Sequence, residues 1–225
     1  MEAERIDIYE ACDKAIHQLN REILRDFGRL KAMDLDAISL IREIKALYRR
    51  LRKRARQKYY EIGFEAYLLG MAMCDVPPEK AHRKAEKRIT GDWADRILEE
   101  VDFVTLYRFN TETERKAERL AEALEEAENL DAEIDRAMRL WSQQVGQYAI
   151  NVTDYAIVEA FTDAGVQYAE WITVPDERRC SECHALHGQI FRIDEVPRKP
   201  HLGCRCRLVP VFRMAEDAAR EGAEA

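Results

Sequence analysis

Four cysteines and one histidine near the C-terminal end of the chain have the types and the spacing of metal ligands. They form a C-x-x-C pair and a C-x-C pair, with the histidine just before the second pair: Cys180, Cys183, His201, Cys204 and Cys206. Structural zinc is held in a tetrahedron of cysteine and histidine side chains. A C-x-x-C turn presents two thiolates to one ion, and alternate residues of a strand point to one face. This stretch therefore predicts a structural zinc site, with His201 as a substitute ligand.

Other arrangements of these residues stay open. His184 and His187 are further candidate ligands, and the four thiols could instead form disulfides or pack as reduced side chains. The first thirty residues are charged throughout and hold no apolar segment of a signal peptide, so we expect the chain in a reducing cytosol. There, paired cysteines are more often metal ligands than disulfides. Cys12 and Cys74 stand alone and are expected to be small buried side chains.

The cysteine stretch lacks the further groups that an active site needs. A catalytic zinc keeps one coordination position open beside a general acid or base, whereas four thiolates leave no such position. The deaminase signature, the Walker A loop and the H-E-x-x-H motif are all missing from the sequence. We therefore expect that the protein is not an enzyme. The nearby acids are expected to cap turns and to pair with arginines: Asp176, Glu177, Glu182 and Asp194.

The cysteines lie in a small β-rich module that spans residues 166–212. Its segments VQYAEWIT, GQIFRI and RCRLVPVF are rich in β-branched and aromatic residues. A module of this size has little core, so a metal ion or a cross-link would contribute much of its stability. Residues 213–225 form an acidic Ala/Glu tail that we expect to be frayed or disordered.

Long amphipathic helices are predicted ahead of the module. Apolar residues recur at three- and four-residue steps through residues 3–31 and again through 41–73, where two prolines end the pattern. A third stripe covers 120–145, after a cap at T-E-T-E, and a separate helix ends at Gly165. The fold class is therefore α+β, mainly α, with long N-terminal helices that pair as in a coiled coil, followed by the small cysteine module.

The net negative charge argues against a protein that coats nucleic acid along its length. One segment of the chain is nevertheless strongly basic. The formal net charge is −7, with 35% charged residues, and no apolar run approaches the ~20 residues that a membrane span needs. One helical segment carries seven basic side chains that could contact DNA or a partner: Arg49, Arg50, Arg52, Lys53, Arg54, Arg56 and Lys58. Contact with DNA phosphates would be non-specific and salt-dependent. The alternatives are a solvated face, or docking onto the acidic helix at 112–135 or onto an acidic partner.

The cysteine stretch resembles the Mu F-like phage head morphogenesis family, the minor head proteins of tailed bacteriophages. The resemblance rests on WITVPDERRCSECHALHG, then PHLGCRC and LVP, and covers about residues 150–210. Proline and asparagine are common in the family where this chain has Leu202 and Gly203. The matching positions are Trp171, Thr173, Asp176, Arg178, Cys180, Cys183, Gly188, His201, Cys204, Arg205 and Cys206.

The resemblance implies a structural protein of the phage procapsid, assembled in the host cytoplasm and then kept inside the head of the virion. Its partners would be the portal protein, the major capsid protein or the scaffolding protein, with DNA contact during packaging or ejection and a homo-oligomer as further expectations. The chain then divides into a variable helical region, a Mu F-like head domain and a tail: 1–110, 111–212 and 213–225. The alternative is a zinc-ribbon-like nucleic-acid-binding protein that uses the basic helix 49–58.

Within the module, four residues are expected to hold the turns. Trp171, Asp176 and Arg178 would fix the entry turn, because turn aspartates accept backbone N–H bonds and an arginine could pair with the same carboxylate. Gly188 would fix the turn that follows the C-x-x-C pair.

Overall fold

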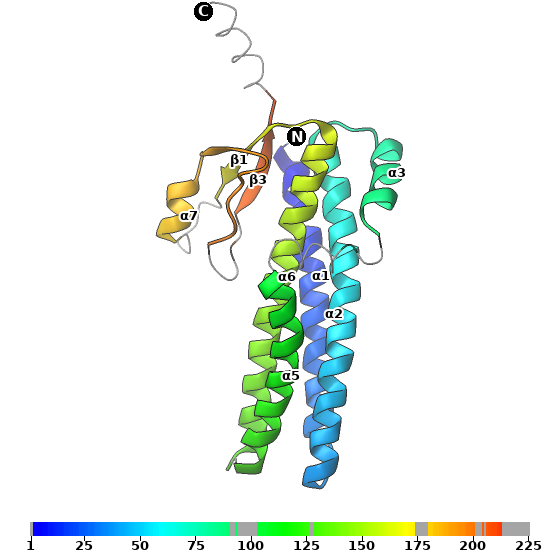
Figure 1. Cartoon of the computed structure of the whole chain (residues 1–225), viewed down its shortest axis with the longest axis vertical. Coiled ribbons are helices and arrows are strands. Elements are labelled where there is room, and N and C mark those ends of the chain that lie inside the picture. The colour runs from blue at the N-terminus through cyan, green and yellow to red at the C-terminus, as the bar shows by residue number, and fades with distance from the viewer. Residues whose placement is uncertain are drawn as a thin grey trace, which may run out of the picture. The chain divides into compact units, whose positions relative to one another are not determined.

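The structure is a computed structural model that describes residues 2–90, 93, 103–126, 128–173, 180–200, 204 and 206–212. Of residues 2–13, 37, 103–113 and 147 it describes the backbone alone. The helices are α1 (Glu2–Lys31), α2 (Ala37–Met73), α3 (Pro78–Arg88), α5 (Phe103–Glu126), α6 (Leu130–Ala164) and α7 (Ser181–Leu186) (Figure 1). The strands are β1 (Tyr168–Ile172), β2 (Ile190–Arg192) and β3 (Arg207–Val211). The predicted class, α+β and mainly α, is confirmed.

The chain divides into two compact units. The helical unit comprises Tyr9–Ile62 and Ile89–Ala149, and the sheet unit comprises Met1–Ile8, Gly63–Arg88 and Ile150–Ala225. Helices α1, α2 and α6 contribute residues to both. The division predicted at residue 110 stays a prediction.

Helices α1, α2, α5 and α6 run side by side in the helical unit (Figure 1). The apolar stripe predicted for α2 is its buried face, and the core aromatic side chains meet edge to face. The ring centroids of Phe27 and Tyr48 are 5.9 Å apart, and those of Tyr48 and Trp141 are 5.3 Å apart. The Tyr59 hydroxyl donates to the Val145 carbonyl at 3.0 Å. The long helices therefore pack within one chain, while the heptad geometry of a coiled coil stays a prediction.

The third apolar stripe belongs to two helices rather than to one. Helix α5 runs through the T-E-T-E segment, so the cap predicted there is wrong, and α6 begins at Leu130. Asn129 caps α6, because its side-chain oxygen accepts from the Ala132 N–H at 3.1 Å. Helix α6 then continues to Ala164, so the separate helix predicted before Gly165 is the second part of α6. Gly165 does end it, with a φ of +86° that suits glycine.

The sheet unit holds a three-stranded antiparallel sheet in the order β2-β1-β3. Central strand β1 pairs Tyr168 with Arg192 on one side and with Val211 on the other. Alternation along β1 buries Ala169 and Trp171. All three segments predicted to be β-rich thus contribute a strand.

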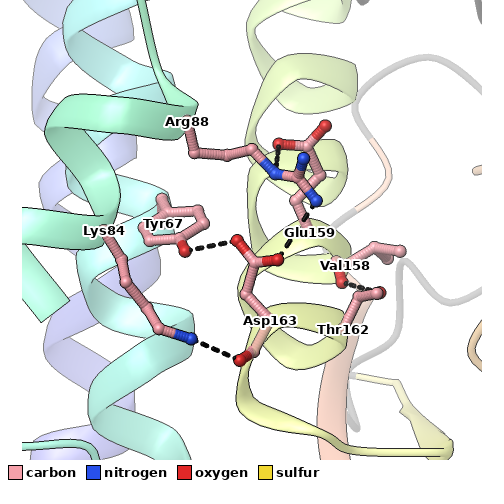
Figure 2. A network of polar contacts seen from close by, with 7 residues as sticks. All are labelled: Tyr67, Lys84, Arg88, Val158, Glu159, Thr162 and Asp163. Atoms are coloured by element: carbon pink, nitrogen blue, oxygen red, sulfur yellow. Dashed lines mark hydrogen bonds and ion pairs between the residues drawn. The ribbon is translucent and has the colours of Figure 1, made fainter.

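Helix α3 is fastened to the last turn of α6 by a polar network (Figure 2). The Asp163 carboxylate accepts from the Tyr67 hydroxyl at 2.6 Å and from the Arg88 guanidinium at 3.1 Å. Lys84 Nζ donates to the Asp163 carbonyl at 2.6 Å, which satisfies one of the carbonyls left open at a helix C-terminus. Arg88 also pairs with Glu159 at 3.4 Å. The network joins α2, α3 and α6 ahead of the sheet.

Removing the carboxylate from this network should weaken the sheet unit. Asp163→Ala leaves the hydroxyl of buried Tyr67 without its acceptor, and an unsatisfied buried group costs about 1–3 kcal/mol. We expect a loss of that size in the free energy of unfolding in urea. The exposed Glu125→Ala on α5 is the control, with an expected change within about 0.5 kcal/mol. Equal stability of the two variants would contradict the structural role of the network.

Gly70 marks a close approach of α2 and α6 in the sheet unit. A Cβ at this position would lie 2.6 Å from the Ala160 Cβ and 3.3 Å from the backbone of Ile157. Alanine is the better helix former by about 1 kcal/mol, but overpacking costs about 1–3 kcal/mol. We therefore expect Gly70→Ala to lower stability in urea and Ala160→Gly in the same chain to restore part of it. A Gly70→Ala protein more stable than wild type would show that the helices separate freely here.

Candidate metal centre

The C-x-x-C pair lies at the start of α7. Cys180 is the N-cap residue, and its Sγ accepts the Cys183 N–H at 3.3 Å. Cys183 follows in the first turn and is buried, whereas Cys180 is half-buried. A capping residue has extended backbone and turns its side chain toward the helix, so the helix start itself holds the two sulfurs near each other.

Three thiols come together as a cluster. The Sγ atoms of Cys183, Cys204 and Cys206 all lie within 4.8 Å of one another, and all three residues are buried. Cys183 Sγ and Cys204 Sγ are 3.6 Å apart. A tetrahedron with Zn–S bonds of about 2.3 Å has S–S edges of about 3.8 Å, so this spacing suits a single ion. The three thiols could hold a metal ion.

The C-x-C pair differs from its predicted setting, although its side chains converge as expected. Cys204 and Cys206 lie just before β3, which begins at Arg207, rather than within a strand. Cys180 stays outside the 4.8 Å cluster. His201, Asp176 and Arg178 lie outside the described residues, so the structure does not test their predicted roles. All the described cysteines are free thiols: Cys74, Cys180, Cys183, Cys204 and Cys206.

Thr173 braces the cluster from the end of β1. Its hydroxyl donates to the Cys183 carbonyl at 2.8 Å and lies 3.8 Å from Cys206 Sγ. Its backbone N–H donates to His187 Nδ1 at 3.1 Å, so that nitrogen is an acceptor already in use. His184 is exposed on α7. Gly188, at a φ of +77°, donates its N–H to the Trp171 carbonyl at 2.8 Å and closes the turn between α7 and β2.

The surroundings of the sulfurs set the pKa of each thiol differently. Burial raises the pKa of Cys183 well above its ordinary value, and the neighbouring cysteines raise it further. Burial also raises the pKa of Cys204. Burial acts in the same direction on Cys206, but hydrogen bonds with Cys204, Cys183 and Thr173 outweigh it and lower the pKa of this thiol. A bound cation would favour the thiolate form of all three, since coordination deprotonates thiols.

Trp171 supplies a further sign that the cluster suits an anionic sulfur centre. Its indole Nε1 is buried and has no hydrogen-bond partner among the described residues. The same indole helps to lower the pKa of Cys206. A metal-bound thiolate is a hydrogen-bond acceptor that would satisfy this N–H. The donor set and its neighbours thus fit a thiolate-bound metal.

Lys199, which contacts the Cys206 carbonyl, and its partner Asp154 are not among the predicted site residues. The Lys199 ammonium is 3.4 Å from Asp154 Oδ2 and 4.8 Å from the centre of the Trp171 ring. The one local signal is a lysine between two prolines in V-P-R-K-P, where the chain has few conformations. Its partner on α6 is too distant in sequence to be found from a local pattern.

The basic residues predicted to contact DNA or a partner lie on α2 and are partly engaged within the chain. Arg54 pairs with Asp26, Lys58 with Glu61 at 2.6 Å, and Arg52 with Glu114 at 3.9 Å. Glu114 is 74% exposed, so its long contact with Arg52 adds little stability. Three others are exposed and form no ion pair with a described residue: Arg49, Arg50 and Lys53.

Comparison with known proteins identifies one family. The model of Phage Mu protein F like protein matches residues 107–209. The match begins within α5, covers α6 and the sheet with its cysteines, and ends in β3. No curated protein and no solved structure matches the chain. Among the described residues, none of the helices is both apolar and long enough for a membrane span.

Proposed function

We propose that this chain is a phage head protein of the Phage Mu protein F like family, whose model matches residues 107–209, and that it is a minor head protein that binds the portal during procapsid assembly. The family match carries the proposal, since it takes in both α6 and the complete cysteine cluster. In this proposal the helices supply the contacts with the portal and the inner capsid, and the cysteine module is a rigid, non-catalytic attachment. The protein then stays inside the head of the virion.

Co-purification tests this proposal. Tagged protein is expressed with the portal, scaffolding and major capsid proteins of its own phage, and the captured proteins are identified by mass spectrometry. We expect the portal to be captured, and to be captured also when it is the sole partner expressed. The matched control is the same chain with Trp141→Ala, which removes a core side chain of the helical unit. Capture of no head protein would overturn the proposal. Capture of the major capsid protein alone would contradict portal binding and indicate that the chain binds the capsid shell.

For the cysteine cluster, the best-supported occupant is structural zinc. Cys183, Cys204 and Cys206 would be three ligands, and Cys180 or His201 the fourth. Bound zinc would supply a cross-link between the start of α7 and the segment before β3, and no chemical step. The 3.6 Å separation of two sulfurs and the buried indole N–H support this over a disulfide.

Contact with DNA is the second candidate function, supported by Arg49, Arg50 and Lys53 of α2, which are exposed and form no ion pair with a described residue. DNA binding through them would release counterions, so the affinity would fall as salt rises, with a slope of about −0.9 per phosphate contacted. Gel-shift titrations start at about 50 mM salt, where non-specific binding is strong. The triple variant Arg49→Gln, Arg50→Gln, Lys53→Gln should weaken binding and flatten the salt dependence.

The control for this titration is a second basic set of equal charge. Lys80, Arg83 and Lys87 are exposed on α3, and their replacement by glutamine changes the net charge by the same amount. Binding that is lost in the α2 variant and kept in the α3 variant supports the α2 surface. Equal losses of DNA binding in both variants, or no gel shift with the wild-type chain, would contradict DNA contact through α2.

A further inference from the structure

Lys199 is buried although lysine side chains are almost never fully buried without a partner. Its side chain is 2% exposed. The ammonium donates to the Cys206 carbonyl, pairs with Asp154 Oδ2 at 3.4 Å, and lies 4.8 Å from the centre of the Trp171 ring. One side chain thus touches a cluster cysteine, helix α6 and the central strand at once.

Asp154 balances this buried charge only in part. The carboxylate is 17% exposed, and Oδ1 has no hydrogen-bond partner among the described residues. Burial raises the pKa of Asp154, and Lys199 opposes that rise. A buried ion pair is stable only when the remaining hydrogen-bonding positions are satisfied. A single oxygen at 3.4 Å is a loose partner for an ammonium group.

The thiol cluster is where further negative charge would collect. A zinc ion with four thiolates has a net charge of −2, and one with three thiolates and a histidine has −1. A fixed cation beside such a centre lowers the cost of assembling it, as groups around a metal site do when they tune its affinity.

We propose that Lys199 is the counter-cation of a metal–thiolate centre and that, through Asp154, it couples metal binding to the docking of the cysteine module on α6. The proposal rests on the zinc occupancy proposed above. Metal binding holds Lys199 in its buried position, and the Lys199–Asp154 contact in turn strengthens metal binding, because linkage between two events is reciprocal. Filling the cluster would thereby fix the module on the helix that precedes it.

The test replaces the charge and keeps the packing. Lys199→Met retains an apolar stem of similar length, so a residue that merely packs would change stability and leave the affinity for zinc unaltered. We expect zinc binding weaker by roughly 10–100-fold in a competition with a chromophoric chelator. Asp154→Asn should weaken it less, and the double variant should bind no more weakly than Lys199→Met, because Asp154 acts through Lys199.

Hydrogen exchange supplies a readout independent of the affinity. Adding zinc to the wild-type chain should protect amides of β1 and of the Asp154 turn of α6 together. In Lys199→Met, saturating zinc should protect the amides beside the cysteines and no longer those of the turn. The exposed Lys80→Met on α3 is the matched control and should behave as wild type in both measurements.

The outcomes separate this inference from the zinc proposal. A wild-type chain that binds no zinc overturns both. A wild-type chain that binds zinc, with Lys199→Met of equal affinity, overturns the role of Lys199 alone. Additive losses in the double variant would show that Asp154 acts independently and would overturn the coupling. If circular dichroism shows that Lys199→Met does not fold, Asp154→Asn decides, and an unchanged affinity there overturns the proposal.

Discussion

Replacing Cys204 by serine should abolish zinc binding and unfold the cysteine module. Cys204 Sγ lies 3.6 Å from Cys183 Sγ in a buried cluster, and a serine hydroxyl is a poor replacement for a thiolate ligand. In a structural site the free energy of metal binding is folding free energy, about 10–16 kcal/mol in zinc-finger peptides. The module has a small core, so losing the ion should expose it while the helical unit stays folded.

Metal analysis and limited proteolysis measure this result. Wild type, purified under reducing conditions, should contain about one zinc per chain and resist cleavage between α7 and β3, because a structural site is filled. Cys204→Ser should contain under about 0.2 zinc and be cleaved there. Cys74→Ser is the matched control, since Cys74 is a free thiol outside the cluster. A wild-type chain without zinc, with all its thiols reactive toward a thiol reagent, would contradict the site.

The same site gives zinc binding a definite pH dependence. Burial raises the pKa of Cys183 and of Cys204, so protons compete with the metal more strongly there than at ordinary cysteines. Metal binding releases those protons, and the affinity should therefore fall as the pH is lowered. Chelator competition at several pH values should show weaker binding in acid. An affinity independent of pH would mean that the thiols are not the ligands.

The second large effect should come from the core of the helical unit. Trp141→Ala removes a side chain that is 0% exposed and packs edge to face on Tyr48, which in turn meets Phe27. Truncating a buried tryptophan costs about 3–5 kcal/mol, because a cavity is left behind. We expect a loss of that size in urea denaturation followed by circular dichroism, which should unfold the bundle at a much lower urea concentration.

The neighbouring leucine supplies the control. Leu140 is 47% exposed on the same helix, so Leu140→Ala removes little buried surface and should change the stability by less than about 1 kcal/mol. If the two variants lost equal stability, the aromatic cluster would not be the core of this unit. The comparison thus separates loss of packing from loss of helix propensity, since both variants place alanine in α6.

Helix boundaries were predicted well where a few adjacent residues determine them. Asp36 begins α2 by accepting the Ser39 N–H at 2.9 Å, and two prolines follow the end of that helix, so both boundaries are written in a few adjacent residues. The break between α5 and α6 was missed because apolar residues continue at helical spacing on both sides of it. Apolar periodicity shows which face of a helix is buried. It does not show where one helix ends and the next begins when both have the same spacing.

The candidate site was predicted only in part, because only some of its residues belong to a local sequence pattern. Cys183, Cys204 and Cys206 could be predicted from their spacing, because they belong to a C-x-x-C and a C-x-C motif. Lys199 and Asp154 could not, since their pairing depends on how the module lies against α6. The cap made by Cys180 and the brace made by Thr173 likewise depend on tertiary structure. The remaining predicted residues, His201 among them, stay predictions.

Mass spectrometry of purified procapsids tests whether this chain is a minor head protein. Procapsids are assembled in cells that express the head genes of the phage with and without this chain, and are separated on a density gradient. We expect the chain to sediment with procapsids in few copies, together with the portal, and to remain in mature heads. A chain absent from both procapsids and virions would contradict it.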